Sequence, residues 1–316
     1  MICKGIGMDE RLLKNKTEKI VELCREAITD GYDVVVTGHD MPDHDSIISA
    51  VMLRELLVRF DVAATVKFGT RPDNVTLRDM QELGVLVDIS FDGFSVNDKL
   101  ILVDHHVTYY KNPVIACVDH HTTQPEPSFE LNLVEKASSC GRMLYAMALA
   151  CGVCNNWFEK LAIFSVYLDT QSCRSPKFDR NDLGWLAESI ARLGIDENKL
   201  IKMGFCLNSP DEDAEVLTDY GYKRYEFGGR VGASTCIQID SADGAWTDKI
   251  PEIIECIKMK MIGNGIELWA FVVNKPEMLR SDIYFISSDG AVETVRLERL
   301  VSRSRDVIPV VKERFL

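Results

Sequence analysis

The chain has 316 residues, of which 46% are hydrophobic, and it carries a formal net charge of −13 with a pI near 5.0. A chain of this length usually builds more than one hydrophobic core, so we expect two domains. The acidic balance argues against a broad nucleic-acid interface, which needs a basic surface to neutralise phosphates. The charged N-terminus lacks the apolar run of a secretory signal, and no later stretch resembles a membrane span. We therefore expect a soluble cytoplasmic protein without a membrane partner.

The first half alternates helical and strand-like segments. Helical periodicity predicts a helix over residues 10–31, and the β-branched run Asp33–Thr37 predicts a strand. A loop, a helix over about 45–60 and a strand within 62–69 follow, and two short apolar strands are expected at 100–103 and 114–118. This alternation is typical of an α/β domain with a mostly parallel sheet.

All six histidines lie in three short clusters with aspartates, and each cluster follows one of these predicted strands. The clusters are His39 with His44, His105 with His106, and His120 with His121. Ligands bind beyond the carboxyl ends of the strands in open parallel sheets, so the three clusters can converge in one crevice. Imidazole and carboxylate groups suit Mn²⁺, Co²⁺, Zn²⁺ and Fe²⁺. The pattern therefore predicts a multinuclear metal site.

A fourth acidic element follows on a helix. Residues 157–178 are apolar at helical spacing and place Asp169 and Thr170 at the helix end, before Arg174, Ser175 and Pro176 break the pattern. A buried carboxylate at that position needs a partner, and a metal ion supplies one. A helix-end residue exposed to water fits this segment equally well.

The ten cysteines are dispersed in apolar segments, which fits a reducing compartment. Only Cys151 and Cys154 are close in sequence. We interpret them as buried thiols near a helix end rather than as a zinc or redox site.

The second half begins with predicted helices at 181–194 and 197–206 and a polar linker at 208–213. Strands at 222–227 and 228–239 form a predicted hairpin across Gly228 and Gly229. A helix at 246–261, strands at 267–274 and 281–287 and a basic tail complete a smaller α+β domain. The expected domains are residues 1–207 and 214–316.

These motifs together resemble those of the DHH-superfamily phosphoesterases with a DHHA2 second domain. The motifs are HxxPDxDS at 39–46, the VDHH runs ending at His106 and His121, LDT at 168–170, KRYEFGG from Lys223 and VSRSRDVIPVV from 301. The resemblance covers nearly the whole chain and is strongest to the manganese-dependent, family II inorganic pyrophosphatases. It implies a metal-binding catalytic domain, a substrate-binding domain and an active site in the cleft between them.

The resemblance also implies roles for single residues. One Mn²⁺ or Co²⁺ ion would be held by His39, Asp43 and Asp104, and a second by Asp45, Asp104, His120 and Asp169. Two such ions, roughly 3.5 to 4 Å apart, generate a bridging hydroxide nucleophile at neutral pH. His121 would contact the substrate and donate a proton to the leaving group. Mg²⁺ can accompany the substrate, and a homodimer is compatible with the family.

The second domain leaves the substrate open. Lys223 and Arg303 match phosphate-binding cations of the pyrophosphatases, and Arg305 can reach in from a neighbouring position, but Ser304 and Asp306 depart from the family's basic run. We expect hydrolysis of pyrophosphate. The alternatives are a phosphohydrolase acting on short polyphosphate or a nucleotide or other phosphoester, and a non-catalytic sensor of a phosphorylated ligand.

Three histidines stay without an assigned role at this point. We expect His105 to hold its loop through ring-nitrogen hydrogen bonds and His44 to lie behind the ligands or face solvent. His106 stands where the pyrophosphatases usually have Asn. Whether it contacts the substrate or a nearby water is left open by the sequence.

Overall fold

The computed structural model describes residues 9–106, 110–122, 128–175, 177–240, 242–301 and 306–315. The chain divides into two compact units, Met1–Gly204 and Phe205–Leu316. In the segment expected to be a linker, the amide of Asn208 donates to the carbonyl of Gln238, and the amide of Gln238 donates to the Asn208 side chain. The start of this segment is thus bonded to the second unit.

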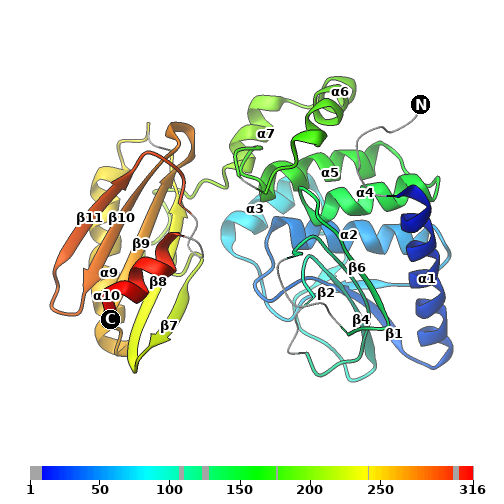
Figure 1. Ribbon diagram of the computed structural model, residues 1–316, viewed down its shortest axis with the longest axis horizontal. Coiled ribbons are helices and arrows are strands. Elements are labelled where there is room, and N and C mark those ends of the chain that lie inside the picture. Colours follow the sequence, from blue (N-terminus) through cyan, green and yellow to red (C-terminus); the bar gives the residue numbers. More distant parts are fainter. Residues whose placement is uncertain are drawn as a thin grey trace. The chain divides into compact units, whose positions relative to one another are not determined.

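The first unit is built on a six-stranded sheet (Figure 1). Its strands are β1 (Asp33–Thr37), β2 (Thr65–Lys67), β3 (Ile89–Ser90), β4 (Asp98–Val103), β5 (Val114–Asp119) and β6 (Leu131–Val134). The spatial order is β3-β2-β1-β4-β5-β6, and every pairing is parallel. The strands β1, β4 and β5 are therefore neighbours at the centre of the sheet.

Helices and loops cover opposite faces of this sheet. The helices are α1 (Glu10–Thr29), α2 (His44–Val58), α3 (Asn74–Leu83), α4 (Cys140–Ala150), α5 (Asn156–Asp169), α6 (Leu183–Leu193) and α7 (Glu197–Gly204), with a 3-10 turn η1 (Arg180–Asp182). Helices α1, α2 and α4 contact the strands, and α5 packs on α2 and α4. Helix α2 is buried almost all round, as expected of a helix between two layers. On the other face, Val35, Leu100 and Leu102 pack against loop residues that include Phe94 and Tyr110.

The second unit is a five-stranded mixed sheet with helices. Its elements are α8 (Ala214–Leu217), β7 (Lys223–Phe227), β8 (Arg230–Gln238), α9 (Trp246–Asn264), β9 (Leu268–Lys275), a 3-10 turn η2 (Pro276–Met278), β10 (Arg280–Ser287), β11 (Val292–Leu297) and α10 (Ile308–Phe315). The order is β11-β10-β9-β8-β7, and α9 connects the parallel pair β8 and β9. Gly228 and Gly229 have φ of 59° and 80°, the left-handed conformation that a two-residue hairpin turn requires. Val307 and Val311 join the core formed by β9 and β10.

The predicted fold class is confirmed: a parallel-sheet α/β unit precedes a smaller mixed unit. Sequence periodicity missed α3, β3, β6, α8, β11 and α10, which are all short elements. Cys151 caps the end of α4, but Cys151 and Cys154 are both half-buried rather than fully buried. None of the described helices is long and apolar enough to cross a membrane.

Candidate metal centre

The three histidine clusters meet because their strands are neighbours. His39 follows β1 after one glycine, Asp104 follows β4 directly, and His120 follows β5 directly. Since β1, β4 and β5 lie side by side and parallel, their carboxyl ends share one edge of the sheet. Asp169 reaches the same place from the C-terminal end of α5. It is only 9% exposed, so the alternative of a solvent-exposed helix end is wrong.

Asp104 occupies the middle of the cluster in an unusual backbone conformation. Its φ is +60°, and its amide donates to the carbonyl of Val118 at 3.0 Å. This left-handed conformation is uncommon outside glycine, although aspartate tolerates it better than most residues. A conformation of this kind at the end of a central strand is typical of functional sites.

Two groups of side chains share Asp104. In the first, His39 Nε2 lies 3.6 Å from Asp43 Oδ2 and 3.7 Å from Asp104 Oδ2. In the second, His120 Nε2 lies 3.2 Å from Asp104 Oδ1, 3.7 Å from Asp45 Oδ2 and 3.8 Å from Asp169 Oδ2. Three donor atoms at such separations can surround one ion. These are the two ligand sets that the resemblance implied, brought together by the fold.

The donor atoms fit divalent cations. Asp104 Oδ1, His120 Nε2 and Asp169 Oδ2 are buried without a hydrogen-bond partner among the described residues. Unsatisfied buried polar atoms are costly, and three of them facing one another are best explained by a cation that they would bind. A mixed set of carboxylate and imidazole donors suits divalent ions such as Mn²⁺, Co²⁺, Zn²⁺ and Fe²⁺.

Electrostatics favours the same interpretation. Burial and the carboxylates of Asp45 and Asp43 raise the pKa of Asp104 to about 7. Although burial lowers the pKa of His39, the carboxylates of Asp43 and Asp104 raise it to about 10. Clustered carboxylates need positive charge nearby, and a divalent ion provides more of it than an imidazolium.

Backbone carbonyls orient both candidate imidazole ligands. The Nδ1 atom of His39 lies 2.9 Å from the carbonyl oxygen of Asp40, and that of His120 lies 3.2 Å from the carbonyl oxygen of Ala137. When Nδ1 donates to a carbonyl, the tautomer leaves the Nε2 lone pair for a metal ion. Both Nε2 atoms point into the cluster.

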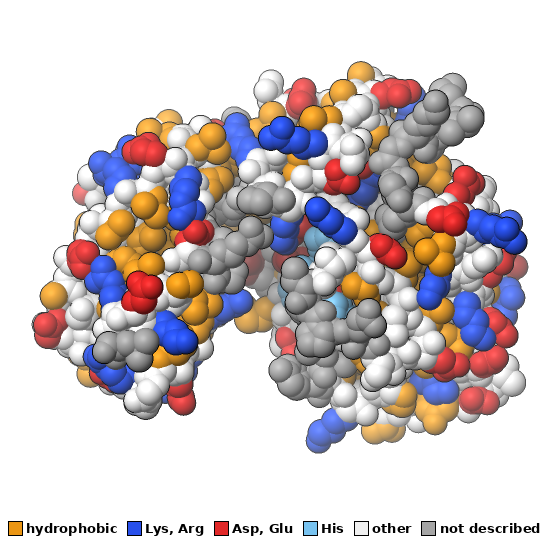
Figure 2. Space-filling model, viewed as in Figure 1, with side chains coloured by type: hydrophobic (Ala, Val, Ile, Leu, Met, Phe, Trp, Pro, Cys, Tyr) orange, Lys and Arg blue, Asp and Glu red, His pale blue; other side chains and the backbone are white. Residues whose placement is uncertain are grey.

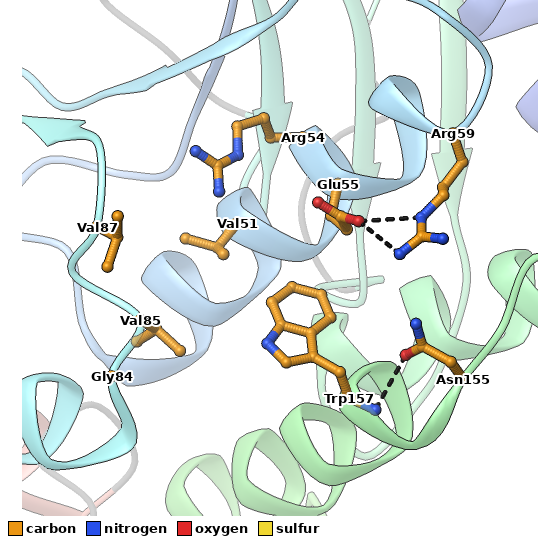
Figure 3. A pocket seen from close by; sticks show the side chains of 9 residues that line it. All are labelled: Val51, Arg54, Glu55, Arg59, Gly84, Val85, Val87, Asn155 and Trp157. Carbon is orange, nitrogen blue, oxygen red and sulfur yellow. Dashed lines mark hydrogen bonds and ion pairs between the residues drawn. The ribbon is translucent and has the colours of Figure 1, made fainter.

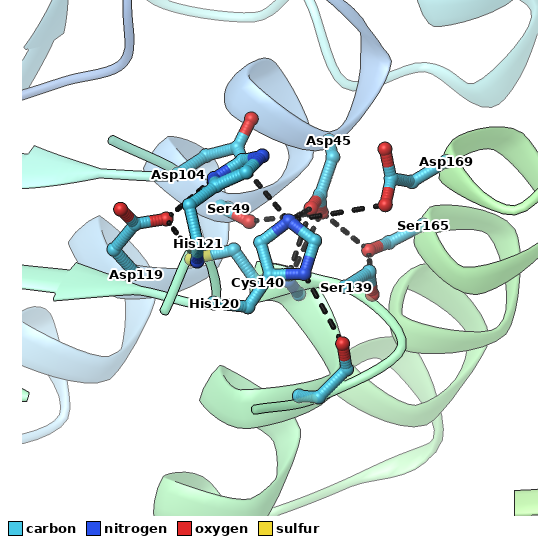
Figure 4. A network of polar contacts seen from close by, with 12 residues as sticks. Asp45, Ser49, Asp104, Asp119, His120, His121, Ser139, Cys140, Ser165 and Asp169 are labelled. Carbon is cyan, nitrogen blue, oxygen red and sulfur yellow. Dashed lines mark hydrogen bonds and ion pairs between the residues drawn. The ribbon is translucent and has the colours of Figure 1, made fainter. Parts of the chain in front are cut away.

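Asp45 is held by the beginning of α4 (Figure 4). Its Oδ2 accepts from the amide of Cys140 at 2.7 Å, and its Oδ1 accepts from the amide of Gly141 at 3.0 Å. The hydroxyls of Ser49 and Ser165 donate to Oδ1 at 3.2 and 2.5 Å. The positive end of the helix and four donors thus fix this carboxylate.

Two glycine and serine pairs allow this close packing. A Cβ on Gly141 would lie 2.4 Å from Ser165 Oγ, and a Cβ on Gly38 would lie 2.4 Å from Ser46 Oγ. Ser46 in turn donates to Asp104 Oδ2 at 3.2 Å. In both pairs the missing side chain of glycine lets a serine reach a candidate metal-binding carboxylate.

His121 lies beside the cluster and is oriented by Asp119, which is fully buried. His121 Nδ1 donates to Asp119 Oδ1 at 2.8 Å, and His106 Nδ1 contacts the other oxygen of Asp119. Although burial lowers the pKa of His121, its bond to Asp119 raises it. His121 is 32% exposed, and histidine reaches the surface of the first unit in Figure 2.

The remaining two histidines, His44 and His105, make different contacts in the fold. His44 is buried and bonds Asp79 Oδ2 of α3 at 3.0 Å through Nε2, so the solvent-facing alternative is wrong. His105 Nδ1 lies 3.0 Å from the carbonyl oxygen of Val103, which is the loop-holding contact that we expected. Its Nε2 is buried without a hydrogen-bond partner among the described residues. Burial lowers the pKa of His105 to about 4, so Nε2 is a free acceptor.

Besides Asp119 and the supporting serines, sequence reasoning missed a lysine of this site. Lys177 Nζ donates to Asp169 Oδ1 at 2.8 Å. It helps to line a pocket of about 370 Å³ whose walls are His39, Asp43, Asp104, His105, His121, Asp169 and Lys177. Nothing in the sequence pattern marks this lysine, because its position depends on the turn that follows α5.

Of the three predicted phosphate-binding cations in the second unit, the structure describes only Lys223. Lys223 is the first residue of β7 and its side chain is exposed. Arg303 and Arg305 lie outside the described residues, as do Ser302 and Ser304.

A second pocket of about 350 Å³ in the first unit has a different character (Figure 3). Trp157 and three valines line it, together with Arg54 and the ion pair between Glu55 and Arg59. The described residues that line it include neither histidine nor aspartate. We therefore take the pocket of about 370 Å³, called the acidic pocket below, as the candidate functional site.

Comparisons with known proteins agree with this site. Residues 33–166 match the model of the DHH family, N-terminal domain. A protein of Methanothrix thermoacetophila named manganese-dependent inorganic pyrophosphatase is 21% identical over 311 residues, which cover 90% of this chain and 98% of that protein. A protein of Deinococcus radiodurans assigned the same activity is 25% identical over 213 residues, which cover 63% of this chain and 67% of that protein.

The fold has a counterpart among solved structures. A Methanococcus jannaschii protein assigned to the family II inorganic pyrophosphatases superposes with a TM-score of 0.64 at 20% identity, covering 89% of this chain and 98% of that one. Together with the strand-end motifs, these matches confirm the resemblance inferred from the sequence. Residues 33–166 of the chain are thus similar to the N-terminal domain of the DHH family.

Proposed function

We propose that this protein is a manganese-dependent phosphohydrolase that cleaves a phosphoanhydride, with inorganic pyrophosphate as the first choice of substrate. The observation that carries the proposal is that two groups of carboxylate and imidazole side chains meet at Asp104, with three buried donor atoms that lack a hydrogen-bond partner among the described residues. The names of the relatives support pyrophosphate, although their identity to this chain is only 21 to 25%.

The proposed ligands are His39, Asp43 and Asp104 for one ion, and Asp45, Asp104, His120 and Asp169 for the other. Two Mn²⁺ or Co²⁺ ions would supply an activated water and neutralise charge on the phosphoryl group. We propose Mg²⁺ as the ion that accompanies the substrate. The remaining chemistry belongs to side chains of the protein.

His121 is the proposed general acid. Its bond to Asp119 fixes the ring and favours the protonated form, so Nε2 can deliver a proton to the leaving phosphate oxygen. Lys223, Arg303 and Arg305 are the proposed contacts of the second unit to the distal phosphate. We further propose a cytoplasmic location and a homodimer.

The test compares manganese-loaded with chelator-treated protein on pyrophosphate, tripolyphosphate and a panel of nucleotides, measuring released phosphate. We expect release that depends on Mn²⁺ and is fastest from pyrophosphate. The Asp104→Asn variant should lose at least about 1,000-fold in kcat/KM, since it removes a charge from both ion sites. Asparagine tolerates the positive φ as aspartate does.

Asp61→Asn is the matched control, because Asp61 also has a positive φ, of 57°, but is exposed and outside the cluster. It should keep wild-type activity. Activity that survives in Asp104→Asn would refute the shared-ion mechanism. Stoichiometric Mn²⁺ binding without release from any compound would instead indicate a phosphate-binding sensor.

A further inference from the structure

The segment after α5 returns the chain to the acidic pocket. Gln171, Ser172 and Cys173 have φ of 51°, 56° and 63°, three consecutive left-handed residues without a glycine. Such conformations are strained and persist only where other contacts enforce them. The turn reverses the chain directly after Asp169.

Several contacts enforce this turn. The amide of Ser172 donates to the carbonyl of Tyr167 at 2.8 Å, and its hydroxyl donates to the carbonyl of Ile201 at 2.8 Å. Gly204 makes room, since a Cβ there would lie 2.3 Å from Ser172 Oγ. The amide of Ser175 donates back to the carbonyl of Thr170 at 2.8 Å. As a consequence, Lys177 contacts the carboxylate of Asp169, although it lies eight residues further along the chain.

The two oxygens of Asp169 have different partners. Oδ1 accepts from Lys177 Nζ at 2.8 Å, whereas Oδ2 is the buried atom that faces His120 Nε2 at 3.8 Å. A cation bound by Oδ2 therefore does not compete with Lys177. An ammonium group has three N–H donors, and the hydrogen bond to Asp169 uses one of them. The Lys177 side chain is 38% exposed, so the remaining donors can face the pocket.

The charges at the site indicate that the ammonium group of Lys177 can pair with a phosphorylated substrate. The carboxylates of the two ligand groups, Asp43, Asp45, Asp104 and Asp169, balance two divalent ions. A phosphorylated substrate then adds negative charge without compensation. Lys177 is the one lysine or arginine among the described residues that line the pocket.

From this geometry we propose that Lys177 binds a phosphoryl oxygen of the substrate, so that the first unit itself contributes a phosphate-binding cation. The proposal rests on the phosphohydrolase function and adds a substrate contact to it. The competing explanation is that Lys177 only positions Asp169 for the ion.

The test uses the full-length protein as wild type, Lys177→Met, Lys177→Arg and the control Lys14→Met. Lys14 is an exposed lysine of α1, remote from the acidic pocket in sequence and absent from its lining. Calorimetry measures the Kd for Mn²⁺ alone, and then the Kd of the manganese-loaded protein for orthophosphate. Steady-state assays give KM and kcat for pyrophosphate.

We expect Lys177→Met to weaken orthophosphate binding about 10-fold to 100-fold and to raise KM by a similar factor, the size of one lost charge-assisted hydrogen bond. The Kd for Mn²⁺ should change less than about 3-fold, Lys177→Arg should recover part of the loss, and Lys14→Met should match wild type. The opposite pattern, with weaker Mn²⁺ binding and unchanged orthophosphate affinity, would overturn the proposal and leave Lys177 as a positioning residue.

Failure of the proposed function looks different. A wild-type protein that releases no phosphate from pyrophosphate contradicts that function, while the orthophosphate titrations still test Lys177. Equal orthophosphate affinity in wild type and Lys177→Met contradicts only the inference about Lys177.

Discussion

Ser165→Ala removes a hydroxyl group that supports Asp45 behind the proposed ion site. Ser165 is fully buried on α5, its hydroxyl donates to Asp45 Oδ1 at 2.5 Å, and its Oγ lies 2.6 Å from Ser139 Oγ. A hydrogen bond to a charged group contributes about 1.5 to 3 kcal/mol, so we expect a loss of that size in unfolding free energy. Partners behind a metal ligand typically change metal affinity 10-fold to 100-fold, and we expect the Kd for Mn²⁺ to rise within about that range.

Ser189→Ala is the control for the loss of a buried bond to a carboxylate. Ser189 is also buried, and its hydroxyl donates to a carboxylate oxygen of Glu159 at 2.5 Å, but Glu159 is outside the acidic cluster. Urea unfolding of the chelator-treated proteins and calorimetric Mn²⁺ titration give the two quantities. Both variants should be destabilised, and only Ser165→Ala should bind Mn²⁺ more weakly. An unchanged Kd in Ser165→Ala, or an equal rise in Ser189→Ala, would refute the role given to Ser165.

Two further predictions concern packing and pH. Gly141→Ala places a Cβ 2.7 Å from Ser165 Cβ and should cost about 1 to 3 kcal/mol in urea unfolding while weakening Mn²⁺ binding. Gly184→Ala in α6, where no atom lies within 4 Å of the added Cβ, should leave both unchanged or slightly raise stability, and an equal loss in both variants would contradict the steric argument. Burial opposes ionisation of Asp282, but Lys275 and Arg296 hold its pKa below the usual range. Its ionised form therefore stabilises the second unit above the unfolded pKa of about 4, and this contribution is lost as pH falls through the lower folded value. In urea unfolding from pH 6 to pH 3, wild type should lose more stability than Asp282→Asn, and parallel pH profiles would contradict this.

Local sequence patterns were sufficient to predict which segments carry the candidate site residues. A β-branched run followed by a polar cluster reports a strand end, and parallel strand ends share an edge, so His39, Asp104 and His120 could be expected together. The α/β fold class followed from the same periodicities, and the expectation of two domains followed from the chain length. The ligand sets of the two ions came from the family resemblance rather than from spacing.

Tertiary structure decided how those side chains are held. Asp45 is bonded to the amide of Cys140, 95 residues away, and His44 turns from the cluster toward Asp79. Close approaches such as Gly141 to Ser165 depend on how two helices pack, which hydrophobic periodicity does not encode.

Lys177 shows the same limit most clearly. In the sequence it is one lysine after a helix-breaking proline. Three left-handed residues, fixed by Tyr167 and Ile201, bring it back to Asp169. The sequence by itself determined which strand ends carry the acidic and imidazole groups, because that information is local. Only the packed structure decided which residues hold those groups in place and that Lys177 lies among them. The reason is that these contacts depend on how separate segments of the chain pack together.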